Sequence, residues 1–142
     1  MSDISNFESR YGHLKCSARS AFYFLSDFRN FEQFIPAGTI KDLAIDKESC
    51  SFRIEILGTI NLHISGLHEF TGIDYAGTVP QVNDFSASIE LKEESLSATD
   101  ARIIVRAGLN PFLKMMVNDA VTRGLESVIR EMENFTGWPV VK

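Results

Sequence analysis

The 142-residue sequence is poor in the residue types and motifs that usually indicate a chemical function. Its two cysteines, Cys16 and Cys50, are far apart and form no Cys-x-x-Cys pair, so neither a disulfide framework nor a zinc-binding pair is predicted. His68-Glu69 lacks the second histidine of a zinc-protease helix, and no Gly-x-Ser-x-Gly, P-loop or Gly-x-Gly-x-x-Gly occurs. The standard hydrolase, nucleotide and dinucleotide signatures are therefore absent.

Excess positive charge and long apolar runs are lacking too. Fourteen lysines and arginines against 19 acidic residues give a net charge of -5, which argues against binding of a nucleic-acid backbone. No apolar run approaches the roughly 20 residues of a membrane-spanning helix, and residues 1–7 lack a basic-then-apolar signal pattern. We therefore expect a cytoplasmic protein with reduced thiols, without an integral membrane segment and without a nucleic-acid partner.

Apolar residues, in contrast, are abundant. Hydrophobic residues make up 44% of the sequence, which is enough for a sizeable core in a chain of this length. We predict one domain over residues 1–142, with its core between residues 7 and 135.

The clearest helical pattern covers residues 110–135. Asn110 can cap the first turn, and Pro111 suits the first helical position. A spacing of three and four predicts a buried face made of Leu113, Met116, Val117, Ala120, Val121, Val128, Met132 and Phe135. Gly124 lies within this face, where either a strand passes close by or a space is left.

The segments before this helix predict a strand, two short helices and further strands. A first strand is predicted over residues 4–15, where one phase holds Phe7, Tyr11 and His13. Ser17 and Asp27 are candidate caps of the two short helices. Six alternating segments follow and predict half-buried antiparallel strands over residues 39–46, 52–56, 60–65, 73–80, 85–92 and 103–109. The polar residues 93–100 are predicted to form a turn.

A sheet with one apolar face and a single long helix to cover it predicts an α+β fold, in which the sheet curls around the helix. The order of elements resembles the SRPBCC superfamily, as do Phe-Leu-Ser-Asp-Phe-Arg-Asn-Phe at residues 24–31 and Leu-Asn-Pro-Phe-Leu-Lys-Met-Met at residues 109–116. This is the helix-grip fold of START and Bet v 1-like domains, also called the polyketide cyclase/dehydrase and lipid transport superfamily.

The resemblance covers residues 7–135 and implies a curved antiparallel sheet of about seven strands, two short helices after the first strand and a long C-terminal helix. It also implies a cavity between sheet and helix, which members commonly use for lipids, polyketides, hormones or other apolar molecules.

The apolar phase of the strands and helix supplies candidate ligand-binding residues for such a cavity. They are Phe52, Ile54, Leu62, Ile64, Tyr75, Phe85, Ala87, Ile103, Val105, Met116, Ala120 and Gly124. Sites for apolar ligands are mostly apolar, with few polar groups that fix orientation. Tyr75 and Tyr11 could offer a hydroxyl, although half-buried tyrosines usually satisfy it at the surface. The phenylalanines and methionines also suit simple core filling.

Candidate catalytic and metal-binding residues do not form a set. His13, His63 and His68 share no face, so surface positions are predicted for them, and neither a metal nor a cofactor is expected. Cys16 lies where a strand meets a helix, so it is either an inert structural thiol or one activated by the helix N-terminus. No catalytic residue is assigned.

Three classes of function stay open. The sequence favours non-enzymatic binding or carriage of a small apolar ligand, because the predicted pocket walls are apolar. A cyclase- or aromatase-type enzyme would require a polar group deep in the cavity. A protein-interaction module, similar to co-chaperone or ribosome-associated members of the superfamily, would have a filled cavity and an exposed apolar patch for a protein partner.

Overall fold

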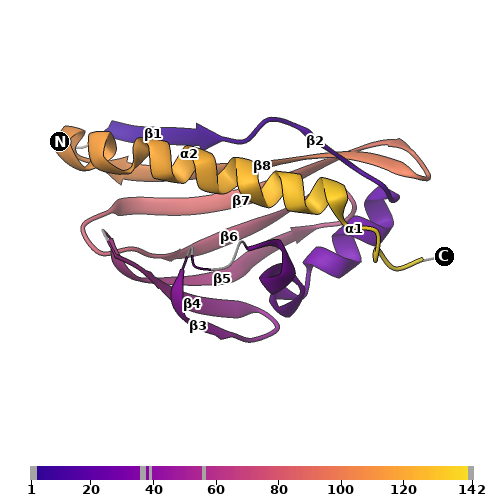
Figure 1. Cartoon of the computed structure of the whole chain (residues 1–142), viewed down its shortest axis with the longest axis horizontal. Coiled ribbons are helices and arrows are strands. Elements are labelled where there is room, and N and C mark those ends of the chain that lie inside the picture. The colour runs from indigo at the N-terminus through magenta and orange to yellow at the C-terminus, as the bar shows by residue number, and fades with distance from the viewer. Residues whose placement is uncertain (1–2, 36–37, 39, 56, 141–142) are drawn as a thin grey trace.

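Figure 1 shows the computed structural model of the chain, which describes residues 3–35, 38, 40–55 and 57–140. Thr39 and Ile56, which alternation assigned to strands, lie outside the described residues. The elements follow in the order β1 (Asp3–Glu8), β2 (Gly12–Leu14), α1 (Ala18–Leu25), η1 (Phe28–Phe34), β3 (Lys41–Ile45), β4 (Ser49–Ile54), β5 (Gly58–His68), β6 (Gly72–Thr78), β7 (Asn83–Ser95), β8 (Ala98–Leu109) and α2 (Pro111–Asn134). The predicted α+β fold is confirmed.

The strands form one antiparallel sheet in the order β1-β8-β7-β6-β5-β4-β3, and β2 also pairs with β8. The long helix α2 lies over the β1 and β8 side of this sheet, while β3 and β4 curl away at the opposite side (Figure 1). Helix η1 contacts the C-terminal half of α2 from the side of the sheet where β3 and β4 lie. The sheet therefore wraps around a helix that covers only part of it.

The predicted first strand is broken in two by a bulge at Ser9. Glu8 pairs with Ile104 and Gly12 with Ala101, so four steps along the N-terminal segment match three along β8. The Ser9 hydroxyl accepts the Ile103 N–H at 2.9 Å and fixes the irregularity. The extra residue reverses the phase of the alternation.

This reversal corrects the sequence prediction for the inward residues. Phe7 is buried, but beyond the bulge Gly12 and Leu14 are the buried residues, while Tyr11 is exposed. His13 is exposed as well, in agreement with the surface positions predicted for the histidines. Tyr11 lies on the outer side, with the Arg102 guanidinium 4.7 Å from its ring centroid. A ligand role for Tyr11 inside the fold is therefore not supported.

Strands β7 and β8 form a longer hairpin than predicted. Ser95 pairs with Ala98, so the turn consists of residues 96 and 97 only, and the polar residues 93–100 mostly continue the two strands. The side chains of residues 92–97 are exposed. The exposed end of this hairpin covers no core, so its residues can be polar on both faces. Without an alternation of apolar and polar residues, the sequence pattern does not predict these strand ends.

The two short helices start at the predicted caps. The Ser17 hydroxyl accepts the Ser20 N–H at 3.1 Å, and the Asp27 carboxylate accepts the Arg29 N–H at 3.0 Å. The second helix, η1, is a 3-10 helix, with Phe28 and Phe34 buried and Phe31 half-buried. Trp138 is buried against Phe34 and closes this end of the core.

Helix α2 begins as predicted, with Leu113 N–H donating to the Asn110 side chain at 2.8 Å and Pro111 in the first turn. Its buried face differs from the predicted one. The apolar residues that pack against the core are Leu113, Val117, Val121, Leu125, Val128, Ile129, Met132 and, at the C-cap, Phe135. Met116 and Ala120 are exposed, so their assignment to the buried face is wrong.

A four-residue repeat explains this difference. From Leu113 to Ile129 most of these residues follow steps of four, and such a row is inclined by about 26° to the helix axis. The buried stripe therefore drifts around α2 and turns Met116 and Ala120 towards solvent.

One flank of α2 is fastened to the β1–β2 connection by an ion-pair cluster that we name the Arg10 clamp: Arg10, Glu126, Glu133 and the backbone of His13. Glu126 accepts the Arg10 N–H at 2.9 Å, and Arg10 Nε lies 3.2 Å from Glu126 Oε2. Glu133 accepts two hydrogen bonds from the Arg10 guanidinium and the N–H of His13 at 2.9 Å. The hydrogen bonds from Arg10 hold the pKa of Glu133 at about 2.

Candidate functional site

The candidate site is the inner face of the sheet, which faces α2 and η1. Alternation places on this face side chains from β4 to β8 that are apolar: Cys50, Phe52, Ile54, Ile60, Leu62, Ile64, Ile73, Tyr75, Phe85, Ala87, Ile89, Ile103 and Val105. Among the described residues, no lysine, arginine, histidine, aspartate or glutamate is buried. The inner face can therefore contact a small molecule mainly through apolar side chains, with the Tyr75 hydroxyl and the Cys50 thiol as its polar groups.

The predicted strand residues fall into two sets by burial. Tyr75 and Ile103 are buried in the core. The remaining ones are only half-buried: Phe52, Ile54, Leu62, Ile64, Phe85, Ala87 and Val105. Large apolar side chains on the inner face of a sheet normally become buried, so a half-buried set indicates that the cover above them is incomplete.

Two separate core clusters lie at the ends of this face. One gathers at η1 and the C-terminal half of α2, and the half-buried Leu62, Ile64 and Ala87 pack against it. The other gathers at the start of α2, where Phe85 and Val105 pack against it. Phe52 and Ile54 pack against neither of these described clusters. The region around β4 thus contributes apolar surface that the core does not use.

Gly124 lies on α2 between these two clusters. A methyl group added at Gly124 would meet no atom within 4 Å, so no strand presses on the helix there. The close approach occurs instead at Gly12 of β2, where an added Cβ would lie 2.5 Å from Cγ2 of Ile129. Of the two readings of Gly124, close strand packing is therefore unsupported.

Tyr75 has the most unusual environment on the inner face. Its side chain is only 6% exposed, and its hydroxyl has no hydrogen-bond partner among the described residues. The rings of Phe28 and Phe31 in η1 lie over it, with centroids 5.1 and 6.4 Å from its own. Burial, with smaller contributions from the nearby Cys50 and Asp74, raises the pKa of the phenol. The hydroxyl is therefore a neutral donor.

The cysteines are free and protonated. Burial raises the pKa of Cys16 to about 12 and that of Cys50 to about 11. Of the two readings of Cys16, the inert structural thiol is the one supported. Cys50 was not assigned to the site, although it shares the phase of Phe52 and Ile54 and could have been found from that alternation.

The histidines lie on the outside of the molecule. His13 is 2.6 Å from the Asp100 carboxylate and His68 is 2.7 Å from the Asp74 carboxylate, while His63 is exposed on β5. Within the described ranges, no three side chains of the metal-ligating types come together. The expectation that no metal is bound stays a prediction.

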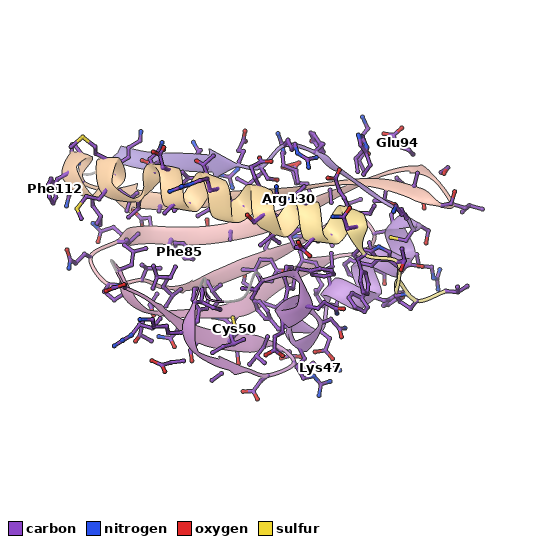
Figure 2. All side chains as sticks on the ribbon, in the orientation of Figure 1. Lys47, Cys50, Phe85, Glu94, Phe112 and Arg130 are labelled. Atoms are coloured by element: carbon purple, nitrogen blue, oxygen red, sulfur yellow. The ribbon has the colours of Figure 1, made fainter. Side chains whose placement is uncertain are left out.

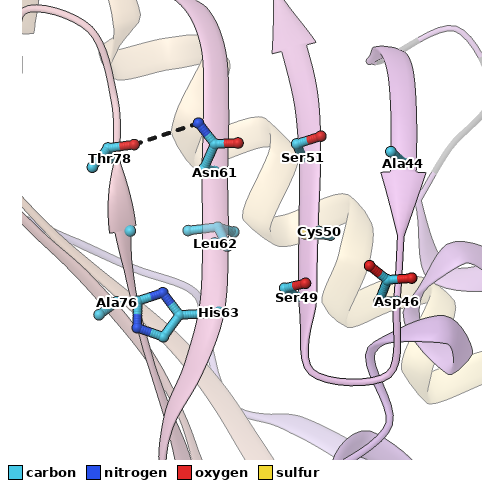
Figure 3. A pocket seen from close by; sticks show the side chains of 11 residues that line it. Ala44, Asp46, Ser49, Cys50, Ser51, Asn61, Leu62, His63, Ala76 and Thr78 are labelled. Carbon is cyan, nitrogen blue, oxygen red and sulfur yellow. Dashed lines mark hydrogen bonds between the residues drawn. The ribbon is translucent and has the colours of Figure 1, made fainter.

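Two surface depressions among the described residues lie mostly away from the inner face. One is mainly on the opposite face of β3 to β6, where α2 passes behind the strands (Figure 3). Its lining includes Ser49, Asn61 and His63 of that face, and also Cys50 and Leu62 of the inner face. The other lies at the start of α2, beside Pro111 and Lys114. Leu62 is the one predicted ligand-binding residue that lines either depression, so the inner-face site rests on burial and not on a closed pocket.

A curved antiparallel sheet wrapped around a long C-terminal helix, with two short helices after the N-terminal strands, is the helix-grip arrangement. The chain has this fold, and the resemblance to the SRPBCC superfamily is confirmed in its architecture. Among the described helices, none is both long and apolar enough to cross a membrane.

Comparisons with known proteins agree in fold and differ in sequence. No family model matches the chain, and no curated protein matches it. A truncated norcoclaurine synthase from Thalictrum flavum matches with a TM-score of 0.72 at 9% identity, covering 94% of this chain and 93% of that chain. The match to the Zhui aromatase/cyclase from Streptomyces sp. R1128 has a TM-score of 0.63 at 14% identity and covers 93% of this chain and 95% of that chain. The match to a START superfamily protein from Mycobacterium smegmatis has a TM-score of 0.63 at 12% identity and covers 92% of this chain and 94% of that chain. At these identities the likeness shows the fold alone.

Proposed function

We propose that the protein binds or carries a small apolar molecule on the inner face of its sheet, without catalysing a reaction on it. The half-buried residues Phe52, Ile54 and Leu62 would contact the molecule, together with the other half-buried side chains of the face. Apolar walls with few polar groups are typical of such sites. The fold is consistent with this proposal, because a START superfamily protein is among the solved structures that this chain resembles.

Two observations carry the proposal: the half-buried apolar residues on the inner face of the sheet, and the open space beside Gly124 on α2. Glycine in mid-helix costs about 1 kcal/mol relative to alanine, and no backbone contact compensates for that cost here. A function that needs the space explains the residue.

Binding of the neutral apolar fluorophore N-phenyl-1-naphthylamine tests the proposal. In Gly124→Leu the leucine fills the space, so we expect at least a tenfold loss of affinity. The melting temperature should stay equal or rise, because helix propensity improves. The matched control is Thr122→Leu, an exposed position on the same helix, which should bind the fluorophore as the parent does.

Two results would refute this function. One is a parent protein that does not bind the fluorophore. The other is a Gly124→Leu variant that melts at a clearly lower temperature, because overpacking there would mean that the space is already filled.

A protein-interaction role is the second candidate, and an exposed apolar patch favours it. Phe112, Met115 and Met116 are 67%, 75% and 46% exposed at the start of α2, where Phe112 projects from the end of the helix far from η1 (Figure 2). Exposed apolar groups of this size often mark contact surfaces. Changing Phe112 and Met115 to serine should abolish capture of a protein partner and leave binding of the fluorophore unchanged.

A cyclase- or aromatase-type activity has less support: the Tyr75 hydroxyl is a buried polar group on the described part of the inner face, but no charged side chain is buried beside it to act as an acid or base. A cytoplasmic location is part of the proposal, and the two free thiols are consistent with it.

A further inference from the structure

The Tyr75 hydroxyl carries an inference about the chemistry of the bound molecule. Buried tyrosine hydroxyls usually find a hydrogen-bond partner, and a buried polar group without one is uncommon. The Tyr75 hydroxyl is fully buried and has no such partner among the described residues. The phenol is therefore a donor that the rest of the described chain does not use.

The ring that bears this hydroxyl has apolar neighbours. Phe28 and Phe31 lie over the ring, Ile64 and Ala87 flank it on the neighbouring strands, and the Cys50 thiol is near. Cys50 is half-buried and packs beside Leu62 and Ile64, so Tyr75 adjoins the half-buried surface proposed to bind the ligand. A molecule lying on that surface can place one end beneath η1.

We propose, resting on the binding function above, that Tyr75 donates a hydrogen bond to a neutral acceptor on the bound molecule, such as a ketone or ester carbonyl. This assigns the ligand to the class of uncharged apolar carbonyl compounds. The phenol fixes the orientation of the molecule, while the apolar residues around it provide the contact area.

A free carboxylate is a poorer ligand for the same position. No lysine, arginine or histidine is buried among the described residues, so a carboxylate beneath η1 would lose its hydration without gaining a cation. The site therefore selects a neutral carbonyl over an ionised fatty acid.

Access to the hydroxyl requires one of the covering rings to shift. Phe28 is buried, whereas Phe31 is half-buried on the short 3-10 helix. Phe31 is therefore the ring that we expect to move when a carbonyl enters.

Three naphthalenes of similar shape test the inference by displacing N-phenyl-1-naphthylamine: 2-acetylnaphthalene, 2-isopropenylnaphthalene and 2-naphthoate. The first two differ only in that the carbonyl oxygen of the ketone is replaced by a CH2 group in the alkene, which cannot accept a hydrogen bond. One hydrogen bond is worth about 0.5–1.5 kcal/mol, so the parent should bind the ketone about two- to tenfold more tightly than the alkene. At pH 7 the naphthoate should bind most weakly.

Tyr75→Phe should abolish the preference for the ketone and leave affinity for the alkene unchanged. The infrared carbonyl band of bound 2-acetylnaphthalene should move to higher wavenumber in this variant, because the hydrogen bond is lost. Tyr23→Phe, which removes an exposed hydroxyl from α1, is the matched control and should behave as the parent.

Equal affinity of the parent for ketone and alkene, or tighter binding of naphthoate than of the ketone, would overturn the inference while leaving the binding function intact. Failure of the parent to bind N-phenyl-1-naphthylamine would instead overturn both.

Discussion

Replacing Glu133 by glutamine would test how strongly the Arg10 clamp holds α2 against the sheet. Glu133 accepts hydrogen bonds from the Arg10 guanidinium and the His13 N–H, and the hydrogen bonds from Arg10 lower its pKa from 4.5 to about 2. A shift of that size corresponds to at most about 3 kcal/mol of folding free energy. The Arg10 side chain is 48% exposed, so water screens the pair, and we expect a loss of about 1–2 kcal/mol at pH 7.

The direction of the pKa shift determines how the stabilisation by Glu133 changes with pH. Since folding lowers the pKa of Glu133, its stabilisation is fully present above pH 4.5 and is lost as the pH falls towards 2. Urea unfolding of parent and Glu133→Gln at pH 7, 4 and 3 should show a difference that shrinks as the pH falls. Glu131→Gln, an exposed position two residues away, is the control and should change stability little.

Equal unfolding free energies of parent and Glu133→Gln at pH 7 would show that the clamp does not stabilise the fold. A loss that stays the same at pH 3 would show that charge is not the cause.

Three further changes probe the packing. Gly12→Ala should lower the unfolding free energy by about 1–3 kcal/mol, because the methyl group would meet Ile129; a thermal melt measures this, and an unchanged melt would contradict the close approach. Thr99→Val should cost about 1 kcal/mol in urea unfolding, since the buried Thr99 hydroxyl donates to the Cys16 carbonyl at 2.8 Å; no loss would mean that this bond contributes nothing. Raised pKa values keep Cys16 and Cys50 protonated, so a disulfide reagent at pH 8 should react far more slowly with folded than with unfolded protein.

Local signals predicted the elements well. The start of α2 was predictable because Asn110 and Pro111 act within one turn, and the strand alternation from Phe52 onward was correct because each of these strands has one apolar face. The bulge at Ser9 was not predictable, since it depends on pairing with Ile103 at the other end of the chain.

The candidate site was predictable on its strands and not on its helix. The alternation of two holds over the strand residues that were predicted for the site, whereas the exposure of Met116 depends on the angle at which α2 crosses the sheet. The cover over Tyr75 comes from Phe28 and Phe31, more than 40 residues earlier in the chain, and no local pattern encodes such a contact.

The Arg10 clamp joins residues that are 116 and 123 positions apart, so the first strands and the last helix become neighbours only when nearly the whole chain is present. During synthesis the apolar inner face of the sheet must wait for α2, which leaves the ribosome after all of the strands. Folding dominated by such distant contacts is slow and exposes apolar surface to aggregation. A nascent chain that ends before residue 111 would therefore present an uncovered sheet to chaperones, and its yield should depend on them more than that of the 142-residue chain.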